Sequence, residues 1–326
     1  MAKFTSDGKH AWSKSFGGVQ CNSIFTGTSQ VNSVAFTPQG DILAVGGFCG
    51  TVNFGDGVIV AQSVGYPDAF VAKLRSSDGS TKTTEGGWTK VFGDGAAQRA
   101  NSVAADAAGN VLVAGIFNGS MNIGLGPVTS AGGSDIFLAK LVANGAPSWV
   151  RTFGDTKDEF ASGLTVDNLG GPILVGTFAG TVDFGGGPVK ATGVGDNGFV
   201  ARYTTGKSFQ WAKTFGSSFV RNLSVVADEA DNTFLSGYFL TTLDLGVGPL
   251  TAAGGRDIFL AKLANTGQTI WNKRFGDKED QESFGVALAQ DGGPILVGAT
   301  HGVVDFGNGP RTSTGVSDGF IVRFGP

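Results

Sequence analysis

Short apolar runs separated by turn signals recur along the chain, and residues 101–155 show the pattern most clearly. This segment holds two apolar runs joined by a Gly-Asn turn, then a Gly-rich spacer, then two more apolar runs joined by Asn-Gly. Val, Ile, Leu and Phe dominate the runs, while Gly, Asn and Asp separate them, which is typical of β-strands and their turns. Four strands are therefore predicted, at residues 102–105, 111–117, 136–141 and 149–153.

Several of these runs are apolar on both faces instead of alternating with polar residues, so both faces of each sheet are expected to be buried. No segment of the chain shows a convincing period of 3.6 residues. The predicted fold class is therefore all-β.

The four-strand pattern repeats with a period of about 61 residues, and a fixed period of this kind indicates a repeat fold. A strand of the form W-x-[KR]-x-F ends each copy, and the sequence DIFLAKL recurs identically at 135–141 and 257–263. All the tryptophans of the chain lie in these strands: Trp12, Trp88, Trp149, Trp211 and Trp271. Packing of each indole against a neighbouring sheet is the favoured interpretation, and stacking on a sugar is the alternative.

The chain ends predict how the repeats close. Units of about 17–92, 93–153, 154–215, 216–275 and 276–326 can be drawn, but the last lacks a Trp strand and residues 1–16 are a spare one. We expect the N-terminal strand to complete the last sheet, giving a single domain, 1–326, that is a closed five-bladed β-propeller of four-stranded blades. Residues 1–4 also align with 321–324, so both segments cannot fill the same strand.

The runs SVAADAAGNVLVAGIF and DIFLAKL, followed by the W-x-K-x-F-G strand, resemble the bacterial β-propeller repeat family often labelled SBBP. The resemblance extends over essentially the whole chain, although the five units and the GTVDFGxGP spacer depart from the family pattern. It implies a propeller fold and a secreted or cell-surface, non-catalytic role. It carries no catalytic residues to this sequence.

Composition narrows the classes of function. Apolar residues make up 41% of the chain, which is enough for a sizeable core, and the 55 glycines fit many tight turns. Charged residues are 15% and the net charge is −4, so nucleic acid is not an expected partner. The sequence has no run of about 18 apolar residues, so no membrane insertion is expected. A polar stretch follows Met1, so either the protein is cytosolic or a targeting segment was removed.

The longest connections, about twenty residues between the second and third strands, are the expected binding face, because loops on a rigid scaffold commonly carry function. Two recurring sets of residues lie there and could bind a cation or sugar hydroxyls. The first is Asn53, Asn122, Asp183, Asp244 and Asp305; the second is Asp68, Asp135, Asp257 and Asp318, with Asp196 beside Asn197 in the third unit. The simpler interpretation is that these side chains fix turns by bonding to nearby backbone.

Other polar residues receive structural interpretations. Two acidic loops could bind Ca²⁺, but their spacing is not that of an EF-hand loop and no GGxGxD repeat is present. They contain Asp155, Asp158 and Glu159, and Asp277, Glu279, Asp280 and Glu282. Solvated loops are the favoured interpretation, and no cofactor is expected. A basic residue recurs inside the third strand, at Lys73, Lys140, Arg202, Lys262 and Arg323. Turn acids such as Asp106, Asp167 and Asp228 are its predicted partners.

Catalysis is not expected. The two histidines, His10 and His301, lie at unrelated positions, and the first strands that would line a central channel contain no acid. A metal site is not expected either.

The two cysteines, Cys21 and Cys49, are expected at the same end of the first unit, where a disulfide or two buried thiols would fit. A disulfide would indicate an oxidising compartment and agrees with an extracellular or cell-surface location. The predicted function is a binding or adhesion module that recognises a glycan or a protein, with an asymmetric site near residues 21–31. A purely structural scaffold is the rival.

Overall fold

The computed structural model describes residues 1–16, 29–61, 65–192, 195–216 and 219–326. Regular structure in these residues is β, apart from one 3-10 turn at Thr83–Glu85, so the all-β prediction is confirmed. The chain divides into two compact units, Met1–Ala161 and Ser162–Pro326, and each is described by itself. The predicted single domain is not tested by this division.

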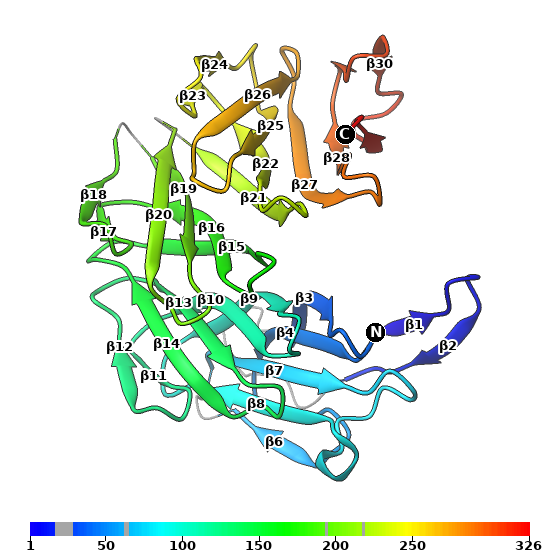
Figure 1. Cartoon of the computed structure of the whole chain (residues 1–326), viewed down its shortest axis with the longest axis vertical. Coiled ribbons are helices and arrows are strands. Elements are labelled where there is room, and N and C mark those ends of the chain that lie inside the picture. The colour runs from blue at the N-terminus through cyan, green and yellow to red at the C-terminus, as the bar shows by residue number, and fades with distance from the viewer. Residues whose placement is uncertain (17–28, 62–64, 193–194, 217–218) are drawn as a thin grey trace. The chain divides into compact units, whose positions relative to one another are not determined.

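Unit 1 contains two four-stranded antiparallel sheets and three two-stranded ribbons (Figure 1). The sheets are formed by β3 (Gln30–Phe36), β4 (Ile42–Phe48), β7 (Asp68–Leu74) and β8 (Trp88–Phe92), and by β9 (Gln98–Ala105), β10 (Val111–Phe117), β13 (Asp135–Leu141) and β14 (Pro147–Phe153). The ribbons are β1 (Ala2–Phe4) with β2 (His10–Ser13), β5 (Thr51–Asn53) with β6 (Val58–Val60), and β11 (Ser120–Asn122) with β12 (Pro127–Thr129).

Unit 2 continues the same plan, and strand β15 (Glu159–Val166) crosses the boundary between the units. β15 forms a sheet with β16 (Pro172–Phe178), β19 (Asn197–Tyr203) and β20 (Phe209–Phe215). The next sheet consists of β21 (Val220–Ala227), β22 (Thr233–Phe239), β25 (Asp257–Leu263) and β26 (Thr269–Phe275). The last consists of β27 (Gln281–Leu288), β28 (Pro294–Thr300) and β31 (Asp318–Arg323). The ribbons are β17 (Thr181–Asp183) with β18 (Pro188–Lys190), β23 (Thr242–Asp244) with β24 (Pro249–Thr251), and β29 (Val303–Asp305) with β30 (Pro310–Thr312).

Neighbouring sheets bury their apolar faces against each other. In unit 1, Trp88 and Phe92 from one sheet share a core with Val103, Val113 and Phe137 from the next. Trp12, Trp88 and Trp149 are all buried, while Trp211 and Trp271 are partly buried. Core packing of the indoles, the interpretation favoured from the sequence, is therefore confirmed for the first three.

In the sheets of the second and fifth repeats, one position of the second strand requires glycine because the backbone of the first strand lies very close to it. The first strand carries a β-bulge, and at that level its backbone comes very close to the second strand. A Cβ atom on Gly115 would lie 2.0 Å from the carbonyl oxygen of Arg99, and one on Gly298 equally close to that of Glu282. Only glycine fits at these positions.

The long connection between the second and third strands is not an open loop. Its ribbon folds back on its own sheet: Met121 and Ile123 of one ribbon are buried, and Tyr203 Oη donates a hydrogen bond of 3.0 Å to the carbonyl oxygen of Phe184 in another. The ribbon turns and the second strand of each ribbon remain exposed at what the sequence predicted to be a binding face, with Val58 68% and Val60 64% exposed.

The N-terminal strand has a local partner. Among the described residues β2 pairs with β1, and the sheet of the last repeat has three strands. The closed five-bladed arrangement, in which the N-terminal strand completes the last sheet, stays a prediction. β1 and β2 pair in the register of the third and fourth strands of a complete sheet: Lys3 lies opposite Trp12, as Lys140 lies opposite Trp149. No helix in the described residues is long and apolar enough to cross a membrane.

Candidate functional site

Each third strand places a basic side chain beneath the turn that joins the first two strands. Its head group meets an aspartate of that turn, and the predicted partners are confirmed. The ion pairs are Lys73–Asp41 (3.3 Å), Lys140–Asp106 (3.0 Å), Arg202–Asp167 (2.9 Å) and Lys262–Asp228 (3.2 Å). These pairs collect charged and polar groups at the end of the sheets that carries the short hairpin turns.

The turn aspartate also shapes the turn itself. Asp228 Oδ1 accepts the backbone N–H groups of Ala230 (3.0 Å) and Asn232 (2.8 Å), and Oδ2 accepts Asn232 Nδ2 (2.9 Å). Burial alone would raise the pKa of Asp228, but the hydrogen bonds from Asn232 and the charge of Lys262 outweigh it and hold the pKa below its usual value. The carboxyl group is therefore ionised at neutral pH.

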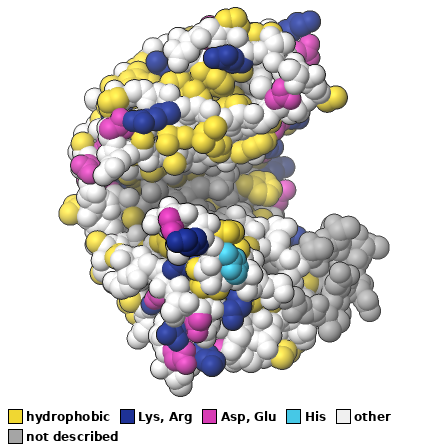
Figure 2. Space-filling view, turned by 90° about the vertical axis from the view of Figure 1, so that its right-hand side faces the viewer, with side chains coloured by type: hydrophobic (Ala, Val, Ile, Leu, Met, Phe, Trp, Pro, Cys, Tyr) yellow, Lys and Arg dark blue, Asp and Glu magenta, His cyan; other side chains and the backbone are white. Residues whose placement is uncertain are grey.

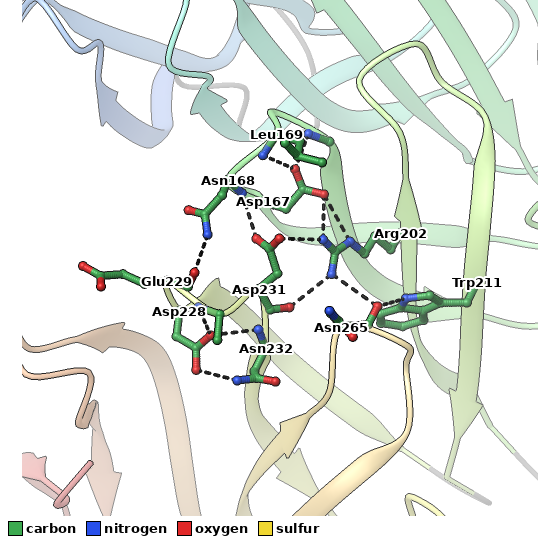
Figure 3. Close-up of polar contacts among 12 residues, drawn as sticks. Asp167, Asn168, Leu169, Arg202, Trp211, Asp228, Glu229, Asp231, Asn232 and Asn265 are labelled. Atoms are coloured by element: carbon green, nitrogen blue, oxygen red, sulfur yellow. Dashed lines mark hydrogen bonds and ion pairs between the residues drawn. The ribbon is translucent and has the colours of Figure 1, made fainter.

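Between the third and fourth repeats, Arg202 ties neighbouring turns together (Figure 3). Its guanidinium is buried and contacts Asp167 at 2.9 and 3.1 Å and the Asp231 carboxylate at 3.5 Å. Nη1 also donates to the carbonyl oxygens of Asp231 (3.1 Å) and Asn265 (3.3 Å), and the latter oxygen accepts Trp211 Nε1 at 2.8 Å. All the groups that face Arg202 are acceptors, as a buried cation requires.

Asn168 also links the same two turns, through two hydrogen bonds that form a bridge between them. The backbone N–H of Asn168 donates to Asp231 Oδ1 (2.9 Å), and Asn168 Nδ2 donates to the carbonyl oxygen of Glu229 (2.7 Å) (Figure 3). Asp231 has a φ of 62°, a left-handed conformation that brings its side chain toward the neighbouring turn.

Among the described residues, this bridge has no counterpart between the fourth and fifth repeats. Gly292 occupies the place that Asp231 takes in the preceding turn, with a φ of 84° and nothing within 4 Å of where its Cβ would be. Ala289 likewise occupies the place of Asp228. A groove of about 560 Å³ lies here, lined by Asp228, Glu229, Lys262, Gln290 and Asp291 among others.

The groove carries both signs of charge. The backbone N–H of Gly293 and the guanidinium of Arg323 hold the pKa of Asp291 below its usual value, so this carboxyl group is also ionised at neutral pH. Asp228 and Asp291 thus offer acceptors, while Lys262 and the amide of Gln290 offer donors. The charged side chains on the face in Figure 2 are interspersed in sign and form no single basic patch.

The first predicted set of ligand residues fixes turns. The Oδ1 atom of Asn53, Asn122, Asp183, Asp244 and Asp305 accepts the backbone N–H of the glycine two residues later, at 2.7–2.8 Å in every ribbon. The side chains are exposed. The simpler interpretation is therefore supported, and a ligand role for these residues stays a prediction.

The second predicted set is mostly buried. Asp68, Asp135 and Asp257 are at most 3% exposed, while Asp318 is more accessible. Asp135 and Asp257 each accept a backbone N–H, from Ala131 and Ala253, at 2.9 Å, and Asp196 forms an ion pair with Arg221. In the first, second and fourth repeats the structure therefore separates an exposed residue of the first set from a buried one of the second.

The metal and cysteine predictions remain open. In the part of the chain that the structure describes, no group of three or more His, Cys, Asp or Glu side chains could hold a metal ion. Cys49 is buried at the end of the first repeat's second strand. Cys21 and most of the asymmetric site predicted near it lie outside the described residues, so the Cys21–Cys49 pair stays a prediction.

Sequence reasoning did not identify the groove residues Glu229, Gln290 and Asp291. The available signal was the change of turn composition in the last repeat, where Ala289 and Gly292 replace the two aspartates of the preceding turn. Its meaning depends on which turn of the neighbouring repeat lies opposite.

No protein-family model matches the chain, and no curated protein matches it. Among solved structures, the chain is similar to the extracellular domain of a protein assigned as a hybrid two-component system from B. thetaiotaomicron. The identity is 11% and the TM-score is 0.18, over 90% of this chain and 52% of that one, so this chain spans about half the length of that protein. A likeness at this level assigns neither fold nor function.

Proposed function

We propose that the chain is a non-enzymatic binding module of the cell surface or extracellular space that recognises a glycan through the groove between its fourth and fifth repeats. The carrying observation is the groove itself, where ionised Asp228 and Asp291 lie with Lys262 and Gln290 in about 560 Å³. Ligand sites in proteins commonly have a volume of about 300–1,000 Å³. Carboxylates accept hydrogen bonds from sugar hydroxyls, and the ammonium and amide groups donate to sugar oxygens.

Binding without catalysis is favoured by the charge state of these acids. Acid-catalysed glycoside cleavage needs a carboxyl group that is still protonated at the working pH. Asp228 and Asp291 instead have lowered pKa values, so neither can donate a proton at neutral pH.

A glycan array with the purified chain tests this proposal. Gly292→Asp introduces the side chain that bridges the preceding pair of turns, and Asp231 shows that an aspartate can adopt the conformation needed. We expect this variant and Glu229→Ala to lose binding at least tenfold, while Asp183→Asn in a ribbon turn keeps it. Loss with Asp183→Asn alone would move the site to the long-connection face, and no binding at all would favour a structural scaffold.

A scaffold role has one observation in its favour. The ribbon turns repeat the same Asx-Gly hydrogen bond in all five repeats, so the exposed face they form offers no distinct site. A protein whose only task is to present a rigid surface would have this uniformity.

We also propose that the repeats close as a five-bladed propeller, with β2 as the fourth strand of the last blade. In unit 1, Trp12 Nε1 donates to the carbonyl oxygen of Ser76 (3.1 Å) and its ring lies against Gly79, as Trp88 does with Ala143 and Gly145. β2 thus already packs on the first repeat as the outer strand of a preceding blade would. In unit 2, β31 has an exposed outer edge, with Ile321 77% exposed.

Closure requires β31 to take the place that β1 holds beside β2. β31 has six residues and β1 has three, so β31 offers more backbone hydrogen bonds. The repeat register then pairs Val322 with Ser13. A double variant, Ser13→Cys with Val322→Cys, should form a disulfide within one chain, identified by peptide mapping. A crosslink only between two chains would instead show exchange of the strand between copies.

A further inference from the structure

In two repeats, a buried glutamine side chain bonds to the loop that leads into the first strand. Gln98 and Gln281 begin the first strand of their sheets and are fully buried. In each case Nε2 donates to the carboxylate four residues earlier, Asp94 or Asp277, at 2.8 Å. Oε1 accepts the backbone N–H of that same aspartate, at 3.4 and 2.9 Å. The amide therefore uses its donor and its acceptor on one residue.

Glu159 occupies the same position in the third repeat and is also fully buried. Its Oε2 accepts the backbone N–H of Asp155 at 3.2 Å, as Oε1 of the glutamines does. Oε1 of Glu159 therefore takes the place of the amide nitrogen, and it has no hydrogen-bond partner among the described residues. A carboxylate oxygen can only accept, so this atom can bond to the acceptors around it only if it carries a proton.

We propose that Glu159 is protonated in the folded protein and donates a hydrogen bond to the Asp155 carboxylate, so that a carboxyl–carboxylate pair locks the loop 154–159 and releases it at alkaline pH.

The charges that act on Glu159 all favour retention of the proton. Asp155 and Asp158 lie on its own loop, and Asp135 approaches from β13. Two basic side chains lie on the same loop or on the strand before it. Lys157 on the loop is exposed to solvent, and Arg151 on β14 lies over the Phe153 ring, with 5.3 Å between its Cζ atom and the ring centroid. Burial, with these carboxylates, raises the pKa of Glu159 to about 8. In the part of the chain that the structure describes, Asp135 Oδ1 is buried without a hydrogen-bond partner, so a further negative charge there is unfavourable.

The loop 154–159 is hydrogen-bonded to one neighbouring segment, the connection that precedes β13. The backbone N–H of Glu159 donates to the carbonyl oxygen of Ser134 (2.7 Å), and the N–H of Ser134 donates to Asp158 Oδ1 (2.8 Å). These bonds join the loop to the connection that precedes β13. Ionisation of Glu159 would place a negative charge beside three carboxylates and weaken both bonds.

Hydrogen–deuterium exchange at pH 6 and pH 9, corrected for the intrinsic exchange rate, tests the proposal on the full chain. Peptides that cover 131–135 and 154–161 should lose protection at least tenfold at pH 9 in the parent protein. Glu159→Gln installs the residue of the sibling repeats and should abolish that loss. Peptides that cover 94–98 and 277–281 are internal controls and should not change.

Two results would overturn the proposal. The same alkaline loss in Glu159→Gln would show that another group is responsible. If excess CaCl₂ restored protection at pH 9 in the parent but had no effect on Glu159→Gln, a bound cation, not a proton, would balance the carboxylates.

Discussion

The indole nitrogen of Trp88 donates a hydrogen bond of 3.0 Å to the carbonyl oxygen of Ala143, and the turn that carries Ala143 places Gly145 against the indole ring. The same contact joins Trp12 to Ser76 and Trp211 to Asn265. In these three cases the Trp strand binds the hairpin turn of the repeat that follows it. This contact satisfies the polar atom of a largely apolar side chain while it fixes the spacing of neighbouring sheets.

Replacement of Trp88 by alanine should lower the free energy of unfolding by about 3–5 kcal/mol, because the side chain is buried and its hydrogen bond is lost. Trp271 is the matched control: it is only partly buried, and among the described residues its indole nitrogen donates no hydrogen bond to a turn of a following repeat. Trp271→Ala should cause a distinctly smaller loss. Urea denaturation followed by circular dichroism measures both, and equal losses would contradict a role for the turn contact.

Gly145 allows the turn to approach the indole. Its φ is 82°, and a Cβ would lie 2.7 Å from Trp88 Cδ2. Gly145→Ala therefore combines backbone strain with a clash. Gly248→Ala is the control for strain alone, since Gly248 has a φ of 107° and nothing within 4 Å. We expect the control to cost about 1–2 kcal/mol and Gly145→Ala to cost more; thermal unfolding would show comparable losses if the clash is relieved without cost.

Local repetition explains why much of this arrangement follows from the sequence. The strands, their order in each sheet and the buried Trp strands depend on apolar runs and turn residues that recur in every repeat, such as those around Trp88 and Trp149. The partners of Lys140, Arg202 and Lys262 also follow, because a cation in an apolar strand needs an acid within the same sheet. The ribbons are harder to predict, since the approach of Phe184 to Tyr203 depends on tertiary packing.

The groove could not be predicted in the same way. Asp231 bridges to Asn168, 63 residues earlier, and the sequence alone does not place these two turns side by side. Gly292 occupies the position equivalent to Asp231 in the next repeat. That this difference leaves the groove open can be inferred only once the contact of Asp231 with Asn168 is known. Likewise, Glu159 resembles any acid of a solvated loop until its burial and its equivalence to Gln98 are seen.

The stability of the protein should fall between mildly acidic and mildly alkaline pH. The pKa of Glu159 in the folded protein, about 8, lies above its ordinary value of 4.5. A group with a raised pKa contributes its full stability below the unfolded value, and that contribution is lost as pH rises through the folded value. The loss should be on the order of a few kcal/mol between about pH 4.5 and 8. Urea midpoints across this range measure it, and Glu159→Gln should flatten the profile.

Acidification should act in the opposite direction through other groups. The pKa of Asp228 is lowered by its bonds to Asn232 and Lys262, so its contribution is present above the unfolded pKa and is lost as pH falls through the folded one. Asp228→Asn should therefore be less stable than the parent at pH 6, with the difference shrinking below the ordinary aspartate pKa of 3.8. A difference that stays constant down to pH 2 would contradict an ionised Asp228.

Arg202 should not tolerate lysine, although lysine occupies the same position in other repeats. The guanidinium contacts Asp167 through two nitrogens and also reaches the carbonyl oxygens of Asp231 and Asn265. An ammonium group cannot reproduce this planar set of bonds, and acceptors would be left unsatisfied in a buried site. Arg202→Lys should lower the free energy of unfolding by about 1–3 kcal/mol. Lys262→Arg is the reciprocal control, because Lys262 bonds one carboxylate and borders the open groove, where a larger head group fits. Chemical denaturation measures the free energy of unfolding of both variants. If Lys262→Arg loses as much as Arg202→Lys, any change of the cation is harmful. The bridge between the third and fourth repeats would then have no special need for arginine.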